Sequence, residues 1–270
     1  MKRAISFVAK YSGLVFLLVI FIFPLFFVIS ISVMSKEQSL MHDLLPNEFY
    51  LSNFSQLFDQ FPLGTWFRNS FYVALIATIV GIVFAFFPAY AMVRMDWKTS
   101  QFMQIAILSS ILFSPQMMLL PLYAKFSELN MIPSYYPLIL PFLLTDAVSV
   151  FLLRQFMMAI PLNLYHSAIS DGASELTIMR KIVFPLCKPG IYATSFLIFL
   201  GCWNDLFQPL IYLTSDQNLW TAPLGLTQIN AIHNVNQNLV MAFSVLLFAP
   251  IIVLFIFSQK HILKSFDLGK

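Results

Sequence analysis

The most conspicuous shortage in this chain is charge. Of its 270 residues only 10% are Asp, Glu, Lys or Arg, whereas 59% are hydrophobic. A soluble globular protein has about a quarter of its residues charged and about half apolar. The shortage excludes a soluble enzyme or binding module and indicates a polytopic membrane protein. The 15 Lys and Arg residues are also too few and too dispersed to form a nucleic-acid surface.

Residues that carry catalysis or bind metals are scarce as well. The two cysteines, Cys187 and Cys202, do not form a CxxC pair, and the four histidines never reach metal-ligand spacing. The chain has no G-x-x-x-x-G-K-[ST] motif, and so no phosphate-binding loop of its own, and it has neither Gly-x-Ser-x-Gly nor His-Glu-x-x-His. The sequence therefore predicts a protein that is not an enzyme and that carries no metal or cofactor itself.

What the chain has in excess is long apolar runs. A helix of about 20 apolar residues crosses a bilayer, and the pattern predicts an all-α polytopic membrane protein with six transmembrane helices. These spans are expected at about residues 13–33, 70–93, 102–123, 135–153, 190–213 and 239–258. The first run is too long for a cleaved signal peptide, so residues 1–270 are expected to form a single transmembrane domain.

Prolines recur inside these runs. Each one removes a backbone hydrogen bond and bends its helix. They are Pro88, Pro115, Pro121, Pro141, Pro209 and Pro250. Such kinks either only shape the packing or together give a bundle that opens and closes around a path.

The basic residues are divided unevenly between the two sides that six spans define. Lys36, Arg68 and Lys125 lie on one side, and all other Lys and Arg residues lie on the side of the two termini. Lys and Arg concentrate in cytoplasmic loops. The sequence therefore predicts that both termini are cytoplasmic, together with the long loop at 161–189 between the fourth and fifth spans.

This loop is expected to contain two short helices joined by a bend. Asn163 and Ser174 stand where the N-caps of these helices are expected. Asp171-Gly172 supplies the bend, because glycine accepts any backbone angle, and Pro185 and Pro189 are expected to end the second helix. A compact knob of this kind is suited to passing force to a partner, but an amphipathic loop lying on the lipid surface would have the same pattern.

A local motif centres on the bend. Its residues are His166, Ser167, Ala168, Asp171, Gly172 and Ala173, followed by Ile182, Pro185, Leu186 and Pro189. The motif resembles the EAA loop of the inner-membrane permease subunits of ABC importers, except that His166-Ser167 replaces the family's Glu-Ala. The surrounding chain, from about residue 24 to 264, resembles the carbohydrate-import branch, the relatives of the smaller maltose-transporter permease.

The resemblance implies a set of partners. In the family the loop is a coupling helix that sits in a groove on an ATPase subunit. By the resemblance, the residues that contact the ATPase here are His166, Ser167, Ala168, Asp171, Gly172, Ala173, Ser174, Glu175 and Pro185. The expected assembly lies in a bacterial cytoplasmic (inner) membrane and contains a second permease, two ATP-binding cassette subunits that bind ATP-Mg, and an extracytoplasmic solute-binding protein.

Polar residues inside the fifth span are candidates for the substrate path. Trp203-Asn204-Asp205 resembles the family's Trp-Asn-Asp motif, and Gln208 and Tyr212 would add hydrogen bonds to sugar hydroxyls. A carboxylate in hydrocarbon must face a partner, a cavity or the interface. Asp205 therefore either lines the path or a contact with the second permease, or makes an interhelical hydrogen bond without touching substrate. For Asp146, near an expected helix end, the structural role is favoured.

The loop after the fifth span, at 214–238, is expected on the opposite side of the membrane. Its segment from Trp220 to Leu226 resembles the family's Thr-x-Pro-x-Gly-Leu segment. By that resemblance the loop contacts the solute-binding protein, and the expected contact residues are Trp220, Pro223, Gly225 and Asn230. A solvated loop without a partner would have the same polar composition.

Taken together, these features predict the transmembrane subunit of an ATP-driven importer. With a second permease it would form the path for a sugar or oligosaccharide, and it would couple to ATPase subunits through the 161–189 loop. The alternative is a stand-alone secondary transporter or channel, which predicts internal repeats and charged residues at the membrane midplane. We find no repeat between the two halves of the sequence.

Overall fold

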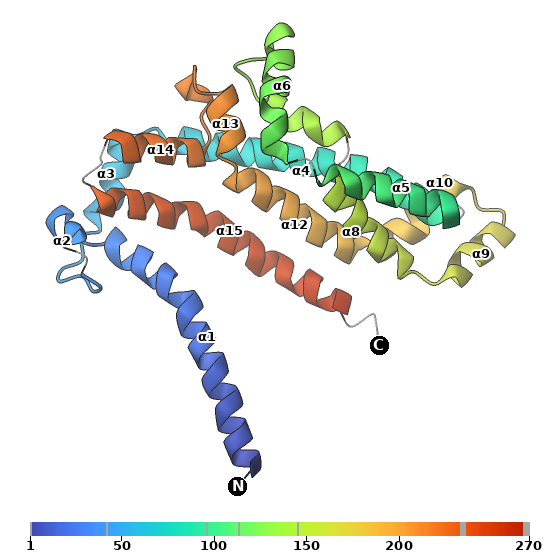
Figure 1. Cartoon of the computed structure of the whole chain (residues 1–270), viewed down its shortest axis with the longest axis horizontal. Helices are drawn as coiled ribbons and strands as arrows, with labels where there is room; N and C mark the ends of the chain where they lie inside the picture. The colour runs from blue at the N-terminus through green and yellow to red at the C-terminus, as the bar shows by residue number, and fades with distance from the viewer. Residues whose placement is uncertain are drawn as a thin grey trace. The chain divides into compact units, whose positions relative to one another are not determined.

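The computed structural model describes residues 2–41, 43–95, 97–112, 114–144, 146–232 and 236–266. No β-strand occurs in these ranges, so the predicted all-α class is confirmed (Figure 1). Two of the four histidines, His42 and His233, lie outside the described residues.

Helices of very different lengths follow one another along the chain. They are α1 (Lys2–Ser32), α2 (Lys36–Leu40), α3 (Ser52–Gln60), α4 (Leu63–Arg94), α5 (Trp97–Ser110), α6 (Pro115–Glu128), α7 (Tyr136–Ile139), the 3₁₀ helix η1 (Leu140–Leu144), α8 (Ala147–Met158), α9 (Leu162–Ser170), α10 (Glu175–Ile178), the π-helix η2 (Met179–Val183), α11 (Phe184–Leu186), α12 (Lys188–Asn204), α13 (Phe207–Tyr212), the 3₁₀ helix η3 (Gln217–Leu219), α14 (Ala222–Ile232) and α15 (Gln237–Phe266).

The chain folds as two compact units. Unit 1 comprises residues 1–64 and 225–250, and unit 2 comprises residues 65–224 and 251–270. All the residues of the 161–189 loop and of the fifth predicted span belong to unit 2.

A buried asparagine holds unit 1 together. Asn53, on α3, is 3% exposed, and its side-chain amide donates to the carbonyl oxygens of Ser32 and Met34, both at 2.9 Å. Its side-chain oxygen accepts a hydrogen bond from Nδ2 of Asn238, also at 2.9 Å. One side chain thus ties the end of α1 and the start of α15 to α3, and its buried polar atoms are satisfied by these partners.

Most of α1, in contrast, presents its side chains to the surroundings. Every side chain from residue 11 to 26 is exposed, and nearly all of them are apolar. A continuous apolar surface of this size marks a site of contact with a membrane or another protein.

Three of the described helices are long and apolar enough to cross a membrane. They are Tyr11–Ser32, Leu63–Arg94 and Gln237–Gln259, which match the first, second and sixth predicted spans. Counting two bent pairs as one span each raises the number, within the described residues, to five. These pairs are Tyr136–Leu144 with Ala147–Met158, bent by 44°, and Glu175–Leu186 with Lys188–Asn204, bent by 74°. Six crossings with both termini in the cytoplasm stay a prediction.

The third predicted span, 102–123, is not one continuous helix. α5 ends at Ser110, and α6 begins at Pro115; each is 14 residues long. Ser114 caps the new helix, and Pro115 occupies its first turn, where a missing N–H is no loss. The fifth predicted span is interrupted in the same way, because α12 ends at Asn204 and α13 begins only at Phe207.

The larger core of unit 2 joins α4, α8 and the 161–189 loop. α8 lies beside both α5 and α12 (Figure 1). The core residues are Ala85, Phe86, Ala89, Tyr90 and Met92 of α4, Val150, Leu153 and Met157 of α8, and then Ile160, Tyr165, Ala168, Ile178, Val183 and Cys187. The 161–189 loop is therefore packed against α4 and α8.

Next to this core, α8 and α12 approach so closely that only glycine fits at the contact. A Cβ atom at Gly190 would lie 2.5 Å from Cγ and 2.8 Å from Cβ of Phe156. These atoms belong to the stem of the phenylalanine side chain, which cannot swing away without moving α8.

Gly190→Ala should therefore destabilise the protein. Overpacking costs about 1–3 kcal/mol, and each kcal/mol shifts the melting temperature of a chain of roughly this size by about 2–4 °C. We expect a lower melting temperature in detergent and partial recovery in the double variant Gly190→Ala, Phe156→Leu. Gly64→Ala is the matched control, because a Cβ there has nothing within 4 Å. Equal stability of the two single variants would contradict the close approach.

Candidate functional site

The bend of the 161–189 loop is a hydrogen-bonded helix end. α9 stops at Ser170, and Gly172 takes a left-handed backbone conformation with φ of 75°. The N–H of Ala173 donates to the carbonyl of Ala168 at 3.0 Å, and that of Gly172 donates to Ile169 at 2.9 Å. This pair of bonds is a Schellman motif, which fixes the direction in which the chain leaves the helix. The predicted bend at Asp171-Gly172 is confirmed.

The two predicted N-caps have different outcomes. Ser174 caps α10 as predicted, because its Oγ accepts a hydrogen bond from the N–H of Thr177 at 3.4 Å. The prediction for Asn163 is wrong: the N-cap residue of α9 is Pro161, and no side chain caps this helix. Pro161 has φ of −58° and extended ψ of 130°, so the helix begins immediately after it and Asn163 falls inside the first turn.

The prediction that Pro185 and Pro189 end the second helix is also wrong. After α10 the chain continues through the π-helical turn Met179–Val183 into α11 and α12. Both prolines lie in the first turn of a helix, Pro185 in α11 and Pro189 in α12, where no backbone N–H is needed. The change of direction lies between Leu186 and Lys188, where the two helical segments meet at 74°.

The loop has an inner and an outer face. Tyr165, Ala168, Ile178, Val183 and Cys187 are buried in the core with α4 and α8. Of the residues predicted to contact an ATPase, only Ala168 is buried, and Ala173 is half-buried. The others are exposed: His166, Ser167, Asp171, Gly172, Ser174, Glu175 and Pro185.

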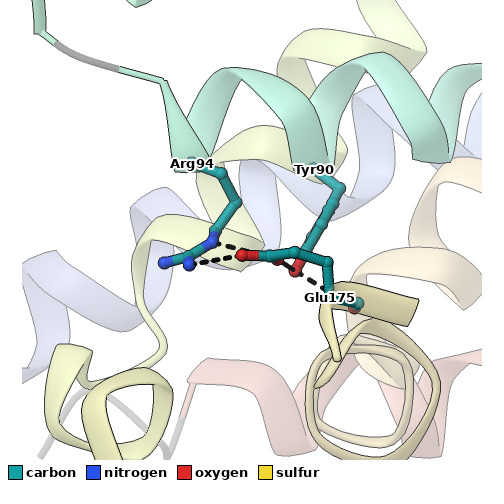
Figure 2. A network of polar contacts seen from close by, with 3 residues as sticks. All are labelled: Tyr90, Arg94 and Glu175. Atoms are coloured by element: carbon teal, nitrogen blue, oxygen red, sulfur yellow. Dashed lines mark hydrogen bonds and ion pairs between the residues drawn. The ribbon is translucent and has the colours of Figure 1, made fainter. Parts of the chain in front are cut away.

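A polar clamp fixes the loop to the last turn of α4 (Figure 2). The guanidinium of Arg94 donates to both carboxylate oxygens of Glu175, from Nη2 to Oε1 at 2.7 Å and from Nε to Oε2 at 3.3 Å. The hydroxyl of Tyr90, one turn earlier on α4, donates to Oε2 of the same carboxylate. Such a two-point contact sets orientation as well as distance.

The same guanidinium also contacts the other side of the bend. Its central carbon lies 5.2 Å from the centre of the Tyr165 ring, which belongs to α9. This is a cation–π distance. Arg94 thus contacts α9 through Tyr165 and α10 through Glu175. These two contacts fix the orientation of both helices relative to the end of α4.

The clamp keeps its carboxylate charged. The hydrogen bond from Arg94, helped by that from Tyr90, holds the pKa of Glu175 below its usual range. Glu175 is therefore ionised at neutral pH, and the ion pair weakens only when the pH falls through this lowered pKa.

The polar residues predicted for a substrate path do not point to one place. Trp203 is buried, stacked on Phe199 with ring centroids 5.7 Å apart, and Tyr212 is buried against the rings of Tyr123 and Phe126. Asn204 is exposed and donates to the carbonyl of Leu200, one turn back.

Asp205 and Gln208, in contrast, line one cavity of about 410 Å³ within unit 2. Five further polar residues line it with them: Gln116, Asp146, Ser149, Cys202 and Thr221. Asp146 also caps α8 by accepting a hydrogen bond from the N–H of Ser149 at 3.0 Å, so it lies at a helix end as expected, but this bond is within its own helix and not between helices.

Sequence reasoning missed most of the cavity's polar lining. Gln116 and Ser149 lie on α6 and α8, each just after a helix start, and nothing in an apolar run indicates which residues such a start brings together. The lining shows no metal site either. In the described part of the chain no group of three or more His, Cys, Asp or Glu side chains is arranged to hold a metal ion, and Cys187 and Cys202 are both free thiols.

The segment predicted to meet a binding protein is anchored at its beginning. Trp220 is 9% exposed and stacks on Trp66, and Nδ2 of Asn69 donates to the carbonyls of Asn218 and Trp220 at 2.8 and 3.0 Å. The N–H of Ala222 donates to Oγ of Ser70 at 2.7 Å. Of the other predicted contact residues, Pro223 is half-buried, Gly225 is buried and Asn230 is exposed.

Three long apolar helices in the described chain and a folded loop clamped to one of them, α4, indicate an α-helical membrane protein. The chain belongs to the family of binding-protein-dependent transport system inner membrane components, which matches residues 81–267. These are membrane transport components and not enzymes, as the sequence predicted.

Individual relatives match over nearly their whole length. The arabinooligosaccharides transport system permease protein AraQ of Halalkalibacterium halodurans is 30% identical over 264 residues, covering 95% of this chain and 93% of that protein. The inner membrane ABC transporter permease protein YcjP of Escherichia coli is 27% identical over 273 residues, with 99% and 97% covered. The trehalose/maltose transport system permease protein MalG of Thermococcus litoralis is 26% identical over 264 residues, with 95% and 94% covered.

The fold has a counterpart among solved structures. A chain of a bacterial ABC transporter involved in the import of the acidic polysaccharide alginate superposes with a TM-score of 0.79 at 19% identity, covering 96% of this chain and 97% of that one. This superposition shows that the fold is shared, while the family match and the relatives named above confirm the resemblance to permease subunits of carbohydrate ABC importers.

Removing the carboxylate of the clamp should loosen the loop without unfolding the protein. The Glu175 side chain is 59% exposed, so its ion pair contributes only roughly 0–1 kcal/mol, and losing about 1 kcal/mol raises local opening about fivefold. In Glu175→Ala we expect faster amide hydrogen exchange at residues 162–178 and an unchanged melting temperature.

The control for this experiment is Glu128→Ala. It removes the exposed Lys125–Glu128 ion pair of 3.0 Å within α6, and exchange in the 161–189 loop should stay as in the unaltered protein. A Glu175→Ala variant whose loop exchanges no faster than this control would show that the clamp holds nothing.

Proposed function

We propose that this chain is the transmembrane subunit of a sugar-importing ABC transporter in a bacterial cytoplasmic membrane, coupled to ATPase subunits through the 161–189 loop. The observation that carries the proposal is the construction of that loop: its outer face is exposed, while its bend, clamp and buried face fix it to α4 and α8. A rigid attachment transmits a displacement, whereas a loop lying on lipid needs none of these contacts.

The substrate class follows from the relatives. Permeases for arabinooligosaccharides and for trehalose and maltose align with nearly the whole chain. A sugar or oligosaccharide is therefore the proposed cargo.

The family also supplies the proposed partners. A second permease completes the path, two ATP-binding cassette subunits bind ATP-Mg, and an extracytoplasmic binding protein delivers the sugar. This chain has no phosphate-binding motif, so the energy of ATP must reach it through contact. With both termini and the 161–189 loop in the cytoplasm, that contact lies on the side where ATP is present.

The path of force runs through α4 and α8. Both helices hold the loop at one end, through residues such as Arg94 and Met157, and line the cavity further along, at Val73 and Ser149. On α4 these positions are about 30 Å apart, at 1.5 Å per residue. Closure of the ATPases pulls the loop, and a rigid-body shift of the two helices then changes the cavity, as alternating access requires.

The binding protein is proposed to meet the 214–238 segment on the other side of the membrane. Asn230 is the exposed member of the predicted contact set. Trp220 and Ala222 instead position the segment, because their hydrogen bonds to Asn69 and Ser70 hold it on the first turns of α4.

The bend should not tolerate proline. Proline fixes φ near −65° and has no N–H, whereas Gly172 has φ of 75° and donates to Ile169. In Gly172→Pro we expect an inserted, assembled complex whose ATP-driven uptake of labelled oligosaccharide is abolished. Gly172→Asn is the control, because asparagine visits this backbone region, and it should keep most of the uptake. Normal uptake by the proline variant would refute the coupling role.

A charge placed on the exposed face of the 161–189 loop should weaken the proposed contact with the ATPase. Ile169 stands beside the bend and is 47% exposed, so Ile169→Asp places a carboxylate in the proposed contact with the ATPase. We expect fewer ATPase subunits to co-purify. Leu129→Asp, at a residue 52% exposed after α6, should co-purify normally. Full transport by this chain without any ATPase would instead support the stand-alone transporter.

A further inference from the structure

Three interrupted helices meet at one cavity of unit 2. α6 starts afresh after α5, α8 starts after η1, and α13 starts after α12. The first turns after these interruptions each contribute polar lining to the cavity: Gln116 from α6, Ser149 from α8 and Gln208 from α13. In a membrane, interrupted backbone persists only where protein buries it or where it lines a polar cavity. The position of the three breaks at this cavity fits that rule.

At each break a side chain accepts a hydrogen bond from the first turn of the next helix. Ser114, Asp146 and Asp205 accept hydrogen bonds from the N–H groups of Gln116, Ser149 and Gln208, at 3.4, 3.0 and 3.3 Å. The carboxylates of Asp146 and Asp205 are thereby held in place at the cavity wall. Carboxylates held in this way are good acceptors for further hydroxyl groups.

Two side chains at the cavity have hydrogen-bonding capacity that the described chain does not use. The side-chain amide of Gln208 makes no hydrogen bond to another described residue, and it offers two donors and an acceptor. The hydroxyl of Thr221, a residue only 4% exposed, has no partner among the described residues. A buried hydroxyl without a partner costs about 1–3 kcal/mol, whereas the amide of Gln208, which is only half-buried, stays accessible to a ligand in the cavity.

The rest of the lining limits what that ligand is. Phe142 and Phe207 offer aromatic surface, and none of the described lining residues is basic. Acceptors, an amide and aromatic faces suit a ring with several hydroxyls and an apolar C–H face. A carboxylated or sulfonated ring would find two carboxyl groups and no cation. A bare metal cation needs six or more converging oxygens for calcium, whereas most of this lining is apolar.

We infer that this cavity binds one uncharged sugar ring of the transported molecule and that it discriminates against acidic sugars. A volume of about 410 Å³ lies at the lower end of the range of small-molecule sites, about 300–1,000 Å³, and suits a single ring. The inference rests on the proposed function, since it assigns a substrate contact to this subunit itself.

Cys202 provides a native reporter of occupancy. It lines the cavity and is half-buried, whereas the only other cysteine, Cys187, is completely buried elsewhere, in the core beneath the loop. The complete importer in lipid nanodiscs is treated with a small uncharged thiol reagent, and labelling of Cys202 is followed by mass spectrometry. The probes are maltose and arabinobiose as neutral sugars, and glucuronate and an alginate disaccharide as acidic ones.

A neutral sugar should slow the labelling of Cys202. At about ten times its Kd only about a tenth of the cavities stay empty, so the rate should fall about tenfold. The acidic sugars should have no effect. Protection by neither neutral sugar, or equal protection by the acidic ones, overturns the inference.

Gln208→Leu tests the binding side chain. Because this amide holds no other described residue, its loss should leave the melting temperature and the sugar-free labelling rate unchanged, while the protection disappears. Gln155→Leu is the matched control, because Gln155 is an exposed glutamine of α8 outside the cavity lining, and protection should persist. Full protection in Gln208→Leu would contradict the assignment.

Uptake by the same complex separates the two proposals. If ATP drives uptake of a labelled neutral sugar that never protects Cys202, this inference fails and the importer role stands. If a neutral sugar protects Cys202 but no ATPase associates with the chain, the importer role fails and the cavity assignment stands.

Discussion

The contact between Arg94 and the two sides of the bend is the constraint that sets the angle between the 161–189 loop and α4. The Schellman turn fixes the loop internally but says nothing about its angle to α4. The guanidinium of Arg94 sets this angle, because it donates to Glu175 from one direction and lies over the ring of Tyr165. Both contacts come from the last turn of a helix whose earlier turns reach the cavity. The loop and part of the cavity wall are therefore attached to the same helix, although the ion pair itself adds little to stability.

The cavity is built at the expense of helix continuity. Three runs that are apolar enough to be read as continuous spans are interrupted, and each interruption leaves backbone groups without helical partners. Serine and aspartate side chains accept hydrogen bonds from some of these groups, so the acids inside the apolar segments are bonded to the backbone. Asp146 and Asp205 are tolerated within apolar segments because each accepts a hydrogen bond from a backbone N–H of the chain.

The sequence predicted structure well where one residue decides the backbone. Gly172 and Ser174 behave as expected because positive φ and an N-cap are each set by one side chain. It failed where neighbours compete: Pro161 starts α9 before Asn163 can cap it, and a π-turn carries the chain past Pro185. Of the predicted path residues, Asp205 and Gln208 reach the cavity, while Trp203 and Tyr212 turn into cores. The two-residue break between α12 and α13 determines which of these side chains reach the cavity. Hydrophobicity averaged over the run does not detect such a break.

The bare flank of α1 has a consequence for how this protein tolerates sequence change. Partitioning into lipid rewards the summed hydrophobicity of a helix, about 0.3–0.6 kcal/mol for each Leu, Ile, Phe or Val, and is indifferent to side-chain shape. Because the side chains at 11–26 are exposed, aliphatic and aromatic residues there are interchangeable as far as the chain's own packing is concerned. Substitutions should therefore accumulate quickly at residues 11–26 and very slowly at Asn53, because no other side chain of that size reproduces its three hydrogen bonds.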